Sequence, residues 1–131
     1  MVIASKQSLS PSTNFGNQGE VHVVAWLKQN NYLILSCNYR SKYGEIDIIA
    51  QQKKVIAFIE VKLRSNNYFN LSEVITISKQ KKIIATAQQY YVQYLKNASL
   101  ILRFDVALLH KQNDAFSLEY IPNAFTKNSD C

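Results

Sequence analysis

Apolar residues recur at helical spacing in two stretches of the chain, which predicts two helices. The first is expected over residues 17–29, where the Asn30-Asn31 pair would end it. Its apolar positions are Val23, Val24, Trp26 and Leu27. The second is expected over residues 78–95. Its apolar stripe, spaced by three, four and four residues and predicted to face a sheet, is Ile84, Ala87, Tyr91 and Leu95.

Shorter apolar segments around these helices predict the strands of a sheet. Strands are expected over residues 32–39, 45–51, 55–63 and 100–109, with a short edge strand over residues 117–121. Gln52-Lys53-Lys54 is short and polar enough to be a tight connection between the second and third strands. The resulting order, α-β-β-β-α-β, predicts an α/β fold in which helices flank a central mixed β-sheet.

No linker, repeat or low-complexity run divides the chain after residue 16, which indicates a single domain over residues 17–121. Residues 1–16 are expected to form a flexible N-terminal leader, and residues 122–131 a C-terminal tail. No apolar run approaches the roughly 20 residues that a membrane span requires. The two cysteines, Cys37 and Cys131, provide no disulfide framework, as is typical of a cytoplasmic protein.

The charge of the chain favours a polyanionic partner. Fifteen Lys and Arg residues against nine Asp and Glu give a net charge of +6. Lys79, Lys81 and Lys82 cluster in the first turns of the second predicted helix, where cations oppose the helix dipole. Their position is explained if these lysines bind phosphate groups of a partner.

Two of the predicted strands carry an acid among apolar neighbours, Asp47 in the second and Glu60 in the third. Lys62 must point to the same side of its strand as Glu60, because strand side chains alternate with a period of two. If the two segments pair as a hairpin, Asp47 can lie beside them. Carboxylates are ligands for Mg²⁺, and a nearby lysine can stabilise developing negative charge. From the spacing alone, a metal site and an ordinary surface or salt-bridged arrangement are both open.

Taken in order, the motifs resemble the YraN-like family of uncharacterised bacterial proteins, which is assigned to the PD-(D/E)XK nuclease superfamily. The resemblance extends from about residue 17 to residue 109 and implies a restriction-endonuclease-like core. The matching segments are Gly19-Glu20, Asn38-Tyr39-Arg40, residues 44–50, residues 58–62 with Arg64, Lys79-Gln80-Lys81-Lys82, and Arg103-Phe104-Asp105-Val106.

The resemblance also implies roles for individual residues. Asp47 and Glu60 would hold Mg²⁺ or Mn²⁺, and Lys62 would be the catalytic lysine. Glu20, which by itself is explained as an acid that complements a helix dipole, would complete the metal site. The charge pattern and the resemblance together give the expected nucleic-acid contacts: Arg40, Lys42, Arg64, Lys79, Lys81, Lys82 and Arg103.

These features predict a metal-dependent endonuclease that hydrolyses phosphodiester bonds of DNA, with branched or otherwise structured DNA as a candidate substrate. The resemblance is compatible with a homodimer. Two alternatives stay open. One is a non-catalytic nucleic-acid-binding module that keeps the fold and the basic surface, and the other is an interaction subunit of a DNA-processing assembly.

Overall fold

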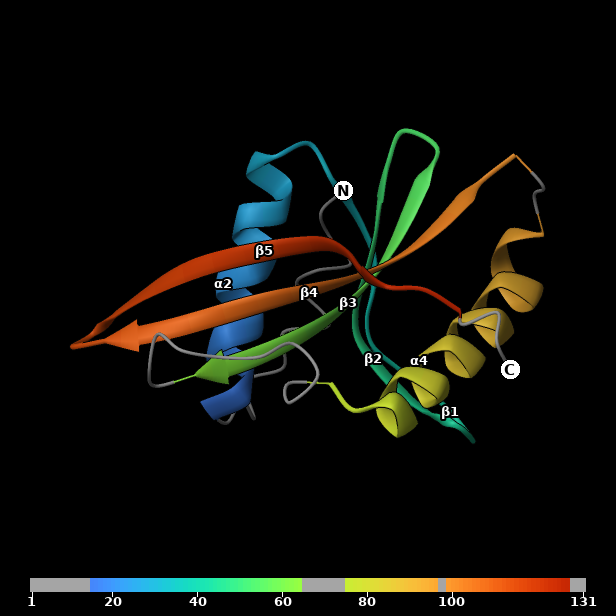
Figure 1. Ribbon diagram of the computed structural model, residues 1–131. Helices are drawn as coiled ribbons and strands as arrows, with labels where there is room; N and C mark the ends of the chain where they lie inside the picture. The colour runs from blue at the N-terminus through green and yellow to red at the C-terminus, as the bar shows by residue number, and fades with distance from the viewer. Residues whose placement is uncertain (1–14, 65–74, 97–98, 128–131) are drawn as a thin grey trace.

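Five strands form one sheet in the order β1-β2-β3-β4-β5, flanked by helices (Figure 1). The computed structural model describes residues 15–64, 75–96 and 99–127. In chain order the elements are α2 (Phe15–Gln29), β1 (Leu33–Ser41), β2 (Gly44–Gln52), β3 (Val55–Arg64), α4 (Ile77–Tyr90), the π-helical turn η1 (Tyr91–Leu95), β4 (Ile101–Gln112) and β5 (Ala115–Phe125). This order confirms the predicted α/β class.

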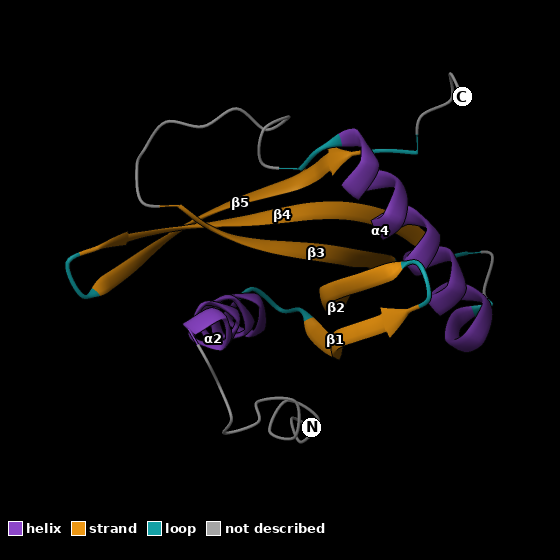
Figure 2. Cartoon of the chain, turned by 90° about the horizontal axis from the view of Figure 1, so that it is seen from below, coloured by secondary structure: helices purple, strands orange, loops and turns teal. Residues whose placement is uncertain are grey.

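The sheet is mixed, as predicted. β3 and β4 pair in parallel, whereas the other neighbours pair antiparallel. A parallel pair needs a crossover connection, and α4 lies in it. Figure 2 shows α2 and α4 against opposite sides of the sheet, so each face of the sheet has its own apolar core.

Helix α2 packs closely against the sheet through the residues that the periodicity selected. Val23, Val24 and Leu27 are buried in the core on this side. Gly19 allows the close approach, because a Cβ atom at this position would lie 2.9 Å from Cδ1 of Leu109 on β4. Neither α2, with 15 residues, nor α4, with 14, has the length and hydrophobicity that crossing a membrane requires.

The second helix begins close to its predicted start but differs in phase. Thr76 caps it by accepting a hydrogen bond from the Lys79 N–H, and the α-helix ends at Tyr90. A π-helical turn follows, in which the Lys96 N–H donates to the Tyr91 carbonyl at 2.9 Å. Tyr90, rather than the predicted Tyr91, is buried in the core on the α4 side of the sheet, and the wider turn brings Leu95, five residues later, against the same core. The residues of α4 that are buried are therefore Ile83, Thr86, Ala87 and Tyr90.

The ends of the predicted domain need correction. β5 continues through residues 122–125, which were expected in the tail, and Phe125 stacks on Phe104 with ring centroids 5.3 Å apart. The Pro122-Asn123 pair interrupts the strand pattern in the sequence, but an edge strand tolerates proline. At the other end, α2 already begins at Phe15, inside the expected leader. Residues 1–14, the rest of the expected leader, lie outside the described residues.

A fully buried acid, Asp105, joins β4 to β5. Its carboxylate accepts hydrogen bonds from the Arg103 guanidinium at 2.8 and 2.9 Å, the Tyr120 hydroxyl at 2.5 Å and the Asn123 N–H at 2.8 Å. Arg103 also donates to the Tyr32 hydroxyl at 2.8 Å, beyond the end of α2. Asp105 raises the pKa of Arg103, and burial with the Asp105 charge raises the pKa of Tyr120. The charge of Asp105 is therefore compensated within the fold.

We expect Arg103→Met to lower the free energy of unfolding by about 3–5 kcal/mol, because it leaves the buried carboxylate of Asp105 without its cation. The matched control is Arg40→Met. The side chains of its ion pair with Glu45 are 77% and 42% exposed, so its loss should cost less than about 1 kcal/mol. Urea denaturation followed by circular dichroism measures both values, and equal losses would contradict a structural role for Arg103.

Candidate functional site

The sheet divides where β2 and β3 stop pairing. The last pair between them is Ile48 with Ile59. Beyond this point β3 continues along β4 as far as Arg64, whereas residues 44–46 of β2 pair only with β1. Figure 1 shows the two strands running apart from the middle of the sheet. The next residues after the last pair are Asp47 on β2 and Glu60 on β3, so both predicted acids stand at the division.

Asp47 of β2 makes a hydrogen bond to β3 at the point where the two strands separate. Its Oδ2 accepts a hydrogen bond of 2.8 Å from the Val61 N–H of β3. The pKa of Asp47 is raised from 3.8 to about 7, first by burial and then by the charge of Glu60, against the opposing effect of the Val61 hydrogen bond. The smaller contributions of Glu20 and Glu45 also raise this pKa. Within residues 15–64, 75–96 and 99–127, no cation forms an ion pair with Asp47.

Glu60 lies between two lysines from different elements. The residue is 6% exposed, and its Oε2 lies 3.4 Å from Nζ of Lys62 and 3.4 Å from Nζ of Lys79. Lys62 comes from the same strand face, as the period of two predicted. Lys79 comes from the first turn of α4, which Thr76 fixes by capping it. The ion pair between Lys79 and Glu60 was not predicted, because it depends on where the connection from β3 to β4 brings α4 back to the sheet.

Glu20 reaches the same region from α2. Its Oε1 accepts a hydrogen bond of 3.2 Å from Nδ2 of Asn38 on β1. Asn38 has a φ of 57° and lies between two paired positions, Cys37 with Ile48 and Tyr39 with Ile46, so it stands across from Asp47. Burial raises the pKa of Glu20, and the Asn38 hydrogen bond opposes this change. An asparagine inside a predicted strand was the only sequence sign of this irregularity, because asparagine adopts the left-handed conformation more often than most residues do.

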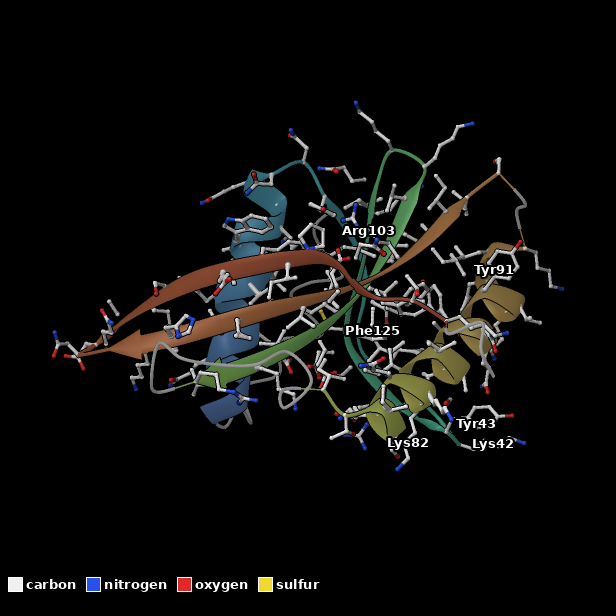
Figure 3. All side chains as sticks on the ribbon, viewed as in Figure 1. Lys42, Tyr43, Lys82, Tyr91, Arg103 and Phe125 are labelled. Atoms are coloured by element: carbon white, nitrogen blue, oxygen red, sulfur yellow. The ribbon has the colours of Figure 1, made fainter. Side chains whose placement is uncertain are left out.

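A cleft of about 450 Å³ opens beside the acids, between the β1–β2 turn and α4. Its basic lining residues are Arg40, Lys79 and Lys82, and Glu45 is the acid among them. Figure 3 shows Lys42 and Tyr43 at the turn, on the side where Lys82 projects from α4. The turn lies against the helix at Gly44, where an added Cβ atom would be in van der Waals contact with Cβ of Lys82, at 3.5 Å. Lys79 joins this cleft to Glu60.

The other predicted nucleic-acid contacts lie elsewhere. Lys81 is exposed on α4, and Nη1 of Arg64 donates to the Leu63 carbonyl at 2.9 Å. Arg103 is bound to Asp105 and stands apart from Lys42 and Lys82 in Figure 3. The structure thus gathers Arg40, Lys42, Lys79 and Lys82 and leaves three of the predicted cations outside this group.

The gathered acids fit a hard divalent cation in donor type and in charge. Carboxylate oxygens are the ligands that Mg²⁺ and Mn²⁺ prefer. Burial and, after it, the charges of neighbouring acids raise the pKa of Asp47 and Glu20, and a cation would relieve the repulsion among these acids. In the described part of the chain, no three His, Cys, Asp or Glu side chains form a ready-made metal group as they lie. Glu60 instead contacts its two lysines and Glu20 contacts Asn38.

Comparisons with known proteins show which protein family the sequence matches. The profile of the uncharacterised protein family UPF0102 matches residues 19–109. A UPF0102 protein of Clostridium botulinum is 44% identical over 115 residues, which cover 86% of this chain and 94% of that protein. A UPF0102 protein of Caldicellulosiruptor saccharolyticus is 41% identical over 113 residues, 84% of this chain and 95% of that protein. These matches confirm the predicted family resemblance, and the names of the relatives state no activity.

The raised pKa of Asp47 gives a test that needs no activity. Between about pH 4 and pH 7 the folded chain keeps a proton on Asp47 that the unfolded chain releases, so its stabilising effect is lost as the pH rises through about 7. In EDTA, the free energy of unfolding should therefore fall with pH across this range relative to Asp47→Asn, by up to about 1.4 kcal/mol per pH unit. Urea denaturation at several pH values measures the difference.

The control for this experiment is Asp114→Asn, which changes an exposed acid in the turn between β4 and β5. Its stability should follow that of the unchanged chain at every pH. Asp47→Asn keeps an oxygen that can accept the Val61 N–H, so the comparison isolates the charge. Parallel pH profiles for the unchanged chain and Asp47→Asn would contradict the raised pKa.

Proposed function

The chain belongs to the uncharacterised protein family UPF0102, and we propose that it acts as a metal-dependent endonuclease that hydrolyses phosphodiester bonds of DNA. The observation that carries the proposal is the meeting of Asp47, Glu60 and Lys62 where the sheet divides, next to a basic cleft. The resemblance of the motifs to PD-(D/E)XK nucleases supports the same reaction. Branched or otherwise structured DNA is the finer substrate class that we propose.

Asp47 and Glu60 would hold Mg²⁺ or Mn²⁺, with Glu20 as a third acid from α2. When bound, the metal would polarise a phosphoryl oxygen and lower the pKa of a coordinated water. The three acids come from three separate elements, α2, β2 and β3, and are partly or fully buried. Their carboxylates could therefore surround a metal ion from different sides. Asp47 must lose its proton to bind a cation, so metal affinity should rise as the pH approaches and passes about 7.

Lys62 would act on the reacting phosphate. Its side chain is 28% exposed, and Glu60 holds its ammonium group at the edge of the acid cluster. From there the ammonium can stabilise the negative charge that develops on the phosphate or hold the attacking water. The neighbouring cations of the cleft, Arg40 and Lys82, would bind the backbone of the strand, which fixes its position without reading its sequence.

One observation favours a second function, that of a non-catalytic nucleic-acid-binding module. The ion pairs of Glu60 with Lys62 and Lys79 satisfy this acid within the protein, so the cluster could serve the fold alone. Such a module would bind DNA with a steep salt dependence and would not cleave it.

The proposal predicts cleavage of DNA that requires Mg²⁺ or Mn²⁺. The purified chain should be incubated with labelled linear duplex, branched and single-stranded DNA, with either metal or with EDTA, and the products separated by electrophoresis. Lys62→Gln and Asp47→Asn should each lower the cleavage rate by about a hundredfold or more, because each removes a group that acts on the transition state. Both variants should keep the circular dichroism spectrum of the unchanged chain.

Lys54→Gln is the matched control, because Lys54 lies in the turn at the opposite end of the β2–β3 hairpin. Its rate should equal that of the unchanged chain. Absence of metal-dependent cleavage on all three DNA forms, together with salt-sensitive binding, would establish the binding module instead. Cleavage that persists in Lys62→Gln and Asp47→Asn would reveal a contaminating nuclease.

A further inference from the structure

Lys79 is the one described residue that both pairs with an acid of the candidate metal site and lines the basic cleft. Its Nζ lies 3.4 Å from Oε2 of Glu60, and its side chain is 41% exposed. The cleft is also lined by Arg40 and Lys82. The lysine thus stands between the place where the metal would bind and the place where the strand would bind.

We propose that Lys79 couples metal binding to phosphate binding. Without metal, Lys79 is held by Glu60. When Glu60 binds a divalent cation, Lys79 leaves it and turns into the cleft, where it joins Arg40 and Lys82 in binding a backbone phosphate adjacent to the one that is cleaved. This inference rests on the proposed function, because it needs the metal at Glu60.

The two lysines on Glu60 differ in their freedom to leave it. Both approach the same oxygen, Oε2, which a metal ion would also use. A divalent cation at this carboxylate would repel both ammonium groups. Lys62 is on β3, two residues from Glu60 on the same face, so its strand keeps it beside the site. Lys79 is on a separate helix, is the more exposed of the two, and has the cleft on its other side.

The cleft is suited to a phosphodiester group once Lys79, which lines it, is released from Glu60. Lys82 has no ion pair within the described residues, and Arg40 shares its charge with Glu45 at 3.1 Å. Release of Lys79 from Glu60 would make the charge of a third cation available in a lining that holds a single acid, Glu45. The first turn of α4 carries Lys79 on backbone that Thr76 already fixes, so only the side chain has to move.

The coupling must act in both directions. If the metal increases the affinity for the strand, the strand increases the affinity for the metal by the same factor. Lys79 is then a positioning residue for metal and strand rather than a group at the reacting atoms. Its removal should change the metal affinity even when no nucleic acid is present.

The first measurement is the affinity for Mn²⁺ alone, by titration calorimetry of the unchanged chain, Lys79→Gln and Lys82→Gln. Lys79→Gln removes a competitor for Glu60 and should bind Mn²⁺ about two- to fivefold more tightly, the range expected for a partly exposed ion pair. Lys82→Gln removes the same charge from the same cleft without touching Glu60. Its affinity for Mn²⁺ should change by less than that of Lys79→Gln.

The second measurement is the affinity for a short fluorescein-labelled DNA strand with phosphorothioate linkages, which resist hydrolysis, by fluorescence anisotropy in EDTA and in Mn²⁺. Mn²⁺ should increase the affinity of the unchanged chain. Lys79→Gln should lose about two- to fivefold of that increase and little of the affinity in EDTA. Lys82→Gln should bind more weakly in both conditions and keep the increase.

The outcomes separate this inference from the proposed function. Mn²⁺ binding with the expected difference between Lys79→Gln and Lys82→Gln supports the coupling. Mn²⁺ binding with equal behaviour of the two variants overturns the coupling and leaves the metal site standing. Absence of Mn²⁺ binding to the unchanged chain overturns the metal site of the proposed function, and the coupling with it.

Discussion

The hydrogen bond from the Val61 N–H to the carboxylate of Asp47 lies at the point where the sheet divides, and the arrangement of the site depends on it. Strands that separate leave backbone groups without ladder partners, and a buried N–H group needs an acceptor. Asp47 supplies that acceptor across the division. The same bond therefore keeps the Asp47 carboxylate beside β3, close to Glu60, while Asn38 holds Glu20 from the opposite side of β2.

Two aspartates in this chain show how differently a fold can treat the same side chain. Asp105 is fully buried and receives a guanidinium, a phenol and a backbone N–H, so nothing is left for a ligand to satisfy. Asp47 receives one backbone N–H and has acids as its charged neighbours, which raise its pKa together with burial. The cation of the proposed metal site would compensate the charge of Asp47, whereas Asp105 already has its cation within the fold.

The sequence allowed the order of the elements and the shared strand face of Glu60 and Lys62 to be predicted, because both follow from local periodicity. It did not allow the burial of Ile83 and Tyr90, in place of Ile84 and Tyr91, to be predicted. Tyr90 and Leu95 are five residues apart and reach the same core through a π-turn, a spacing that a period of 3.6 does not contain. The extension of β5 past Pro122 was missed because it depends on Asp105, which takes the Asn123 N–H, and on the packing of Phe125. The structural role of Arg103 and the second lysine on Glu60 are contacts between distant segments, which no local pattern contains.

The crossover between β3 and β4 explains why the acids and the cations meet. A parallel pair requires the chain to return along the sheet, and on this return the first turn of α4 comes to lie beside Glu60 of β3. A helix N-terminus adds partial positive charge there, and Lys79 and Lys82 add full charges. The topology thus places a negative cluster suited to a cation directly against a positive cleft suited to a phosphate, and a phosphodiester bond held by both would lie between them.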